Sequence, residues 1–134
     1  MSTNEEFGAS YKKLSIFGPK IGVIKLNDSV VKKMTELTDD ILKDENRSSH
    51  GAYLGGQIAE EPTVDLNKLK EEGLDAFFNQ VLQHHITATL NASREIKTKL
   101  TSMWVVSQRE HEYNPVHWHE GCSLSCTLYL KIPD

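Results

Sequence analysis

The feature that most constrains the fold is a strand-like segment in the last third of the chain, in which two histidines stand two positions apart. This segment, residues 116–120, reads Val-His-Trp-His-Glu and follows Pro115, whose ring favours an extended backbone just before it. Side chains at positions i and i+2 of a strand lie on the same face, so His117 and His119 can converge on one point while Trp118 faces away. Because neutral imidazole binds zinc, iron and copper, the two histidines are candidate metal ligands.

A further strand is predicted soon afterwards, over residues 124–132, from a strict alternation of side chains. The even positions are apolar, and the odd positions carry Ser125, Thr127, Tyr129 and Lys131. Such alternation is typical of a strand with one buried face and one face in solvent. The alternative is that the polar face lines a pocket, as it does in barrels that hold a polar ligand.

The first part of the chain predicts a hairpin followed by a helix. Residues 13–26 contain two short β-branched runs separated by a Gly-Pro pair, which indicates a strand, a turn and a second strand. Over residues 30–42, apolar side chains repeat at three and four positions, which predicts an amphipathic helix. Asn27 or Asp28 can cap its first turn.

A second helix is predicted from near Leu66 and is most regular over residues 74–90. His85 falls within its apolar stripe. Neighbouring helical side chains point about 100° apart, so His84 and His85 cannot chelate one ion together, and we interpret them as structural. Between the two helices, residues 46–62 are rich in Gly, Ser and Glu and predict a long loop that is either a lid or disordered.

Beyond residue 91 the sequence changes to a β-type pattern, with a segment rich in valine and tryptophan at 102–108. The length of 134 residues predicts a single domain. Within it, we expect residues 1–100 to form the N-terminal strands and support helices, and residues 101–134 to form the first core strands with the histidine motif.

Charge and composition narrow the possible partners. The net charge of −4, with Lys and Arg interleaved among Asp and Glu, argues against nucleic acid as the main partner. No apolar run approaches the roughly 18 to 20 residues that span a bilayer, so we expect a soluble cytoplasmic protein, in the host cytoplasm if phage-encoded. Cys122 and Cys126 lie too far apart in a strand for a disulfide, and we interpret Cys126 as a small buried hydrophobe.

Four short segments of the last third together resemble a known family: Trp104-Val-Val, Asn114-Pro-Val-His-Trp-His, Leu124-Ser and Leu128-Tyr-Leu. The family is a group of 2-oxoglutarate- and Fe(II)-dependent oxygenases found in marine bacteria and cyanophages. The sequence departs from the family pattern at Val106, where asparagine is frequent, and at Cys126, where glycine is frequent.

The resemblance implies an α+β fold in which this chain forms the N-terminal part of a double-stranded β-helix, or jelly roll, with two support helices. It makes His117 the first iron ligand and places His119 where related enzymes usually have Asp or Glu. It also implies a set of side chains that bind 2-oxoglutarate, and the candidates are Ser125, Thr127 and Tyr129. The implied activity is the oxidation of a substrate coupled to the decarboxylation of 2-oxoglutarate to succinate.

The ligand set that this resemblance implies is incomplete in the sequence. Glu120 can join the two histidines only through a bulge, which Gly121 permits, and His111 can join only if the intervening turn folds back. The family's distal histidine and the arginine that grips the co-substrate are missing. We therefore expect the chain to be a C-terminally truncated, incomplete part of a longer protein.

Two other classes of function remain as alternatives. One is a non-catalytic, cupin-like metal-binding or phage accessory protein that keeps the scaffold without redox activity. The other is a zinc-dependent hydrolase, which is less favoured because the sequence has neither an H-E-x-x-H motif nor a Cys/His ligand set. A small-molecule substrate and a peptidyl substrate both stay open.

Overall fold

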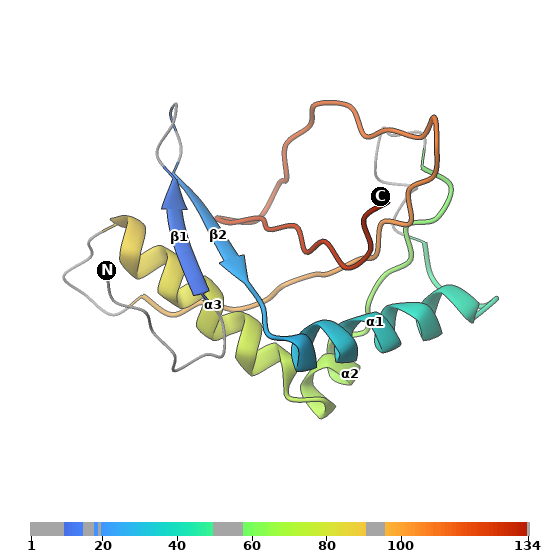
Figure 1. Ribbon diagram of the computed structural model, residues 1–134, viewed down its shortest axis with the longest axis horizontal. Coiled ribbons are helices and arrows are strands. Elements are labelled where there is room, and N and C mark those ends of the chain that lie inside the picture. Colours follow the sequence, from blue (N-terminus) through green and yellow to red (C-terminus); the bar gives the residue numbers. More distant parts are fainter. Residues whose placement is uncertain (1–9, 15–17, 19, 50–57, 91–95, 134) are drawn as a thin grey trace.

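The computed structural model describes residues 10–14, 18, 20–49, 58–90 and 96–133 of the chain. Within them it has a two-stranded antiparallel sheet and three helices, which is compatible with the expected α+β class. In Figure 1 the helices lie together in the lower part of the view, and the orange and red last third runs above α1 and α2. In chain order the elements are β1 (Ser10–Leu14), β2 (Ile21–Lys25), α1 (Asp28–Lys43), α2 (Leu66–Glu71) and α3 (Leu74–Leu90).

The second strand expected within residues 13–26 is confirmed as β2, whereas β1 begins at Ser10 and overlaps the expected range only at residues 13 and 14. The two strands pair in an antiparallel register that sets Tyr11 opposite Ile24. Gly18 lies in the connection with φ of +71°, a conformation that glycine adopts without steric cost. The β-branched run at residues 21–25 therefore predicted β2, whereas β1, with the sequence Ser-Tyr-Lys-Lys-Leu, has no β-branched residue and was placed by its pairing with β2.

The hairpin is fastened to the C-terminal end of α3 by two lysines. Lys13 Nζ donates a hydrogen bond to Ala88 O at 3.1 Å, and Lys20 Nζ donates one to Thr89 O at 2.6 Å. The last turn of α3 has no basic residue of its own. Because the final carbonyls of a helix lack partners within it and carry partial negative charge, the two ammonium groups stabilise this helix end.

Helix α1 follows the prediction closely. Asn27 is the N-cap, and its side-chain oxygen accepts a hydrogen bond from Val30 N at 3.0 Å. Met34, Thr38 and Ile41 are buried, at spacings of four and three residues, so the amphipathic stripe faces the core as expected.

The second predicted helix is divided in two. Gly73, with φ of +70°, separates α2 from α3, and its N–H donates to Lys70 O at 3.0 Å. A glycine in the left-handed conformation just past a helix is a common C-terminal stop. Gly73 after Glu72 was thus a helix stop signal in the sequence. The helical periodicity on both sides of it led to the prediction of one continuous helix.

The core lies between the three helices and the segment before α2. Its buried apolar members are Met34, Ile41, Val64, Leu69, Leu74 and Phe78. The last third of the chain reaches this core only with partly buried side chains, among them Met103, Val105, Leu128 and Leu130. The helices therefore supply most of the buried apolar surface.

Residues 60–64 and 103–107 run antiparallel in one continuous register. Thr63 pairs with Trp104, and Glu60 pairs with Ser107. Three backbone hydrogen bonds join the segments: Val64 N to Met103 O (2.9 Å), Val105 N to Pro62 O (2.8 Å) and Ser107 N to Glu60 O (3.0 Å). The extended character predicted for residues 102–108 is thus present, but as isolated bridges and not as a regular strand.

The strands predicted over 116–120 and 124–132 are not formed. In the described part of the chain, no strand lies beyond β2, and none of the backbone hydrogen bonds outside helices and strands involves residues 113–133. A β-strand needs a neighbouring segment to accept and donate its backbone hydrogen bonds, and alternation alone does not provide one. The described residues accordingly contain no jelly roll.

None of the helices in the described ranges combines the length and the apolar character needed to cross a membrane.

Candidate metal centre

The two histidines of the motif lie side by side. Their ring centroids are 4.9 Å apart with an angle of 79° between the planes. His117 Nδ1 is 2.8 Å from the carbonyl oxygen of Pro115. Because a carbonyl can only accept, Nδ1 carries the proton in this hydrogen bond, and the neutral ring is left with the lone pair of Nε2. The His117 ring is therefore in the tautomer whose unprotonated Nε2 can bind a metal.

His119 is held against the short ladder by Trp104. The two ring centroids are 5.5 Å apart, and the planes are tilted by 45°. Met103 and Val105, on either side of Trp104, pack toward the helical core. Since side chains alternate along an extended segment, Trp104 and His119 lie on the face of the ladder that points away from the helices.

The expected third ligands are not brought to the pair. Glu120 Oε1 instead accepts a hydrogen bond from Trp118 Nε1 at 3.5 Å, in a turn where Gly121 has φ of +74°. His111 is highly exposed, and its Nε2 lies 3.4 Å from Glu110 Oε1. Among the residues that the structure describes, no group of three or more His, Cys, Asp or Glu side chains is placed to hold a metal.

The residues expected to bind the co-substrate lie on an exposed edge. Ser125, Thr127 and Tyr129 are all exposed, and Tyr129 retains 73% of its accessible surface. Lys131 Nζ donates instead to Asp39 Oδ1 of α1, at 2.6 Å. Figure 1 shows the red end of the chain in the same region of the view as α1.

The apolar side of this segment is only partly buried. Leu124, Leu128 and Leu130 are half-buried, but Ile132 is exposed. Cys126 is also exposed, so its interpretation as a buried hydrophobe was wrong. The physical reason is that this face is covered only in part: Leu128 and Leu130 pack against the helical core, whereas Cys126 and Ile132 lie at exposed positions.

His84 and His85 have the structural role expected of them. The Tyr11 hydroxyl is 2.9 Å from His85 Nδ1, and the Tyr11 ring meets the His84 ring edge-on with centroids 4.8 Å apart. Burial and, to a smaller extent, the neighbouring charge of His84 lower the pKa of His85. Burial raises the pKa of Tyr11. Both shifts favour the neutral forms that share this hydrogen bond.

A cluster of charged residues was missed by the sequence reasoning. Glu60 forms ion pairs with Arg47 and with Arg109, each at 3.3 Å. Glu61 beside it is buried. Arg47, Glu60 and Glu61 lie within the predicted loop 46–62, and Arg109 comes from the last third of the chain. Residues 50–57 of that loop fall outside the described residues, so the prediction of a lid is not tested there. Loop sequence has no periodicity, so only tertiary pairing could reveal which of its charges are buried.

Comparisons of the chain with protein-family models, with curated proteins and with solved structures give no match. The resemblance to the oxygenases therefore rests on the motif residues of the last third, and the roles it implies stay predictions.

Proposed function

We propose that this chain contributes the first two iron ligands of a 2-oxoglutarate- and Fe(II)-dependent oxygenase, which oxidises a small-molecule or peptidyl substrate and converts 2-oxoglutarate to succinate. The observation that carries the proposal is the hydrogen bond from His117 Nδ1 to Pro115 O, which leaves Nε2 available beside the ring of His119. Histidines that bind metals usually donate their other ring N–H to a carbonyl or carboxylate in this way.

The donor set fits iron in type. Imidazole is a ligand of the facial triad of non-haem Fe(II) oxygenases, which consists of two histidines and one carboxylate, and in the resemblance His119 stands at the carboxylate position. When bound, iron and 2-oxoglutarate supply the oxidising chemistry, and the residues of this chain hold and orient them. His117 and His119 are the metal ligands of the proposal, and Trp104 limits the movement of the His119 ring by packing against it.

The co-substrate residues of the proposal are Ser125, Thr127 and Tyr129. Each has a hydroxyl that can donate to a carboxylate, and they alternate along one segment, so an extended backbone presents them on one side. In this account they bind 2-oxoglutarate through neutral donors. Lys131 is the less favoured carboxylate partner, because it already pairs with Asp39.

The test is an anaerobic incubation of the chain with Fe(II) and 2-oxoglutarate, followed by admission of oxygen and measurement of succinate. Because this chain supplies only two ligands of the proposal, we expect succinate above the rate of free iron from a longer product that adds the third ligand, and we expect His117→Ala and His119→Ala in that product to remove this excess. His111→Ala is the matched control, because His111 is exposed and apart from the pair, and it should retain the rate of the original chain. Metal binding without succinate would favour the non-catalytic metal-binding alternative.

A further inference from the structure

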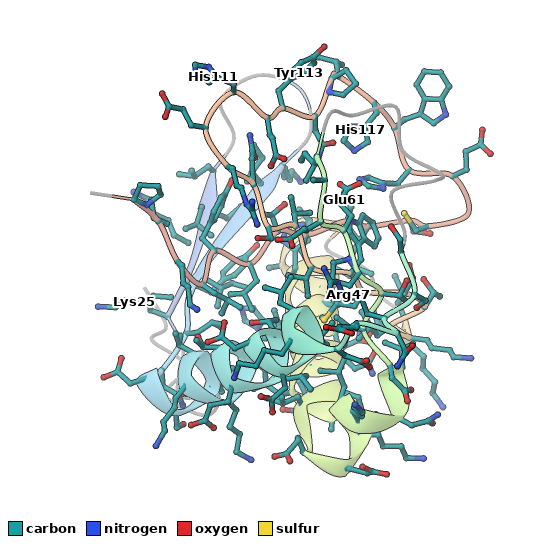
Figure 2. The ribbon with its side chains drawn as sticks, turned by 90° about the vertical axis from the view of Figure 1, so that its right-hand side faces the viewer. Lys25, Arg47, Glu61, His111, Tyr113 and His117 are labelled. Carbon is teal, nitrogen blue, oxygen red and sulfur yellow. The ribbon has the colours of Figure 1, made fainter. Side chains whose placement is uncertain are left out.

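Outside the histidine motif, the described residues include a buried carboxylate with one oxygen that has no hydrogen-bond partner. Glu61 is only 2% exposed, and its Oε1 atom is buried with no hydrogen-bond partner. The register of the ladder sets Glu61 opposite Val106, whose side chain offers no donor. Figure 2 shows Glu61 at a height between Arg47 and His117. A buried carboxylate oxygen without a donor costs free energy, so Glu61 Oε1 is an open acceptor for a donor group of a ligand.

Glu61 lines a pocket of about 260 Å³ at the edge of the ladder. The pocket is formed on one side by residues 59–62 and on the other by Glu45, Arg47 and Ser49. The two sides are joined by the pairing of Ser49 with Pro62 and by the bond from Thr63 N to Ser48 O at 2.9 Å. Backbone pairing therefore fixes the position of Glu61 in the pocket wall.

The guanidinium in the pocket is already engaged. Arg47 Nη1 donates to Leu42 O and to Asp44 O, at 3.1 and 3.0 Å, and its Nη2 donates to Glu60 Oε1 at 3.3 Å. The second oxygen of Glu60 accepts from Arg109 at 3.3 Å. Both arginines are thus directed to Glu60, and in the described residues neither forms an ion pair with Glu61.

The balance of charge around the pocket is negative. Glu45, Glu60 and Glu61 line it, and Arg47 is the basic residue among the described lining residues. Arg47 and Arg109, the latter outside the lining, both pair with Glu60, and in the described residues neither pairs with Glu61. The buried, unpartnered oxygen of Glu61 is where the negative charge of the lining is least solvated.

We propose that this pocket binds the ammonium or guanidinium group of a small organic cation, with the Glu61 carboxylate as its counter-ion. An ammonium or guanidinium group would bring a positive charge and N–H donors to Glu61, which has neither an ion pair nor a donor at Oε1 among the described residues. A divalent metal fits less well, because the described residues contain no group of three or more ligating side chains. The volume accommodates a group of the size of a lysine or arginine side chain. This proposal does not depend on the histidine pair.

The experiment is an NMR titration of backbone amides in the full chain with agmatine and, separately, with n-butylamine. We expect shifts that saturate at residues 47–49 and 59–63, and we expect Glu61→Gln to weaken this binding by about 10-fold or more, because a charge-assisted hydrogen bond is lost. Glu36→Gln is the matched control, since Glu36 is an exposed carboxylate of α1 that pairs with Lys32. It should bind both amines as the original chain does.

Three results would overturn the proposal. They are the absence of saturable shifts, equal weakening by Glu61→Gln and Glu36→Gln, and saturable binding of Mg²⁺ or Ca²⁺ at the same residues in preference to the amines. Glu61→Asp is a second variant that also changes the buried side chain but keeps its carboxylate, so it separates the loss of charge from a general disturbance of the fold. If the pocket recognises charge, that variant should bind the amines better than Glu61→Gln does.

Discussion

The helical part of the molecule and its last third carry equally regular sequence patterns, but only the helical part is buried by them. Met34 and Leu69 are 2% and 0% exposed, whereas Trp118 and Tyr129 are 82% and 73% exposed. A helix satisfies its backbone hydrogen bonds within its own segment, so its apolar stripe needs only a surface to pack against. A strand needs a second segment for its backbone as well. A regular helical pattern is therefore enough to predict burial, whereas a regular strand pattern predicts burial only where a second segment pairs with it.

The two regions should differ most in the free energy of unfolding that is lost when an apolar side chain is truncated to alanine. Leu69→Ala should lower the free energy of unfolding by about 2–5 kcal/mol, because a fully buried leucine leaves a cavity. Val116→Ala, at a fully exposed position, should change it by less than about 0.5 kcal/mol. Urea denaturation followed by circular dichroism measures both. Similar losses from the two substitutions would mean that Val116 is buried and that the contrast is wrong.

The junction of the hairpin with α3 gives the next largest effect. A Cβ atom on Gly22 would lie 2.5 Å from His85 Nδ1 and 2.7 Å from Tyr11 Cε2. Gly22→Ala should therefore destabilise the fold by about 1–3 kcal/mol through overpacking. The neighbouring Ile21, which is 56% exposed, provides a control, and Ile21→Ala should cost clearly less. Thermal unfolding compares the two, and equal losses would show that the close approach to His85 does not exist.

The cap of α1 is expected to contribute less. Asn27→Ala removes the oxygen that accepts from Val30 N and should cost about 1 kcal/mol. Asn27→Ser keeps a capping oxygen and should retain most of the stability. If the two variants unfold at the same denaturant concentration, the side-chain cap is not what stabilises the start of this helix.

The smallest effect concerns pH. Burial and the charge of His84 lower the pKa of His85 in the folded chain, so the unfolded chain takes up the proton more readily. The resulting stability is fully present above the unfolded pKa, about 6.5, and is lost as the pH falls through it toward the lower folded value. The melting temperature should thus decrease from pH 8 to pH 5, and less so in His85→Gln. An unchanged pH profile in His85→Gln would remove His85 as the cause.

The elements that the sequence predicted correctly are those with local signals. Gly18 in the connection of the hairpin, Asn27 before α1 and the apolar stripes of both helical regions each act over a few residues, and each has its counterpart in the structure. The strands of the last third could not be predicted in the same way, because pairing depends on segments far away in the chain. Residues 103–107 illustrate this, since their partner is residues 60–64.

In the candidate site, too, the sequence predicted what depends on nearby residues and missed what depends on long-range contacts. The spacing of His117 and His119 indicated a pair, and the structure brings their rings together. The contact of Trp104 with His119 joins residues 15 positions apart and could not follow from strand periodicity. Glu61 had no signal at all, because its burial depends on pairing with two separate segments of the chain.

The most direct test of the central claim is a titration of the chain with Co(II) under anaerobic conditions, followed by visible absorption as a substitute for Fe(II) binding. The account predicts one bound metal per chain, with binding strongly weakened in both His117→Ala and His119→Ala and unchanged in His111→Ala. Binding that survives the loss of His117 and His119, or that is lost equally in His111→Ala, would contradict the assignment of this histidine pair as the metal site.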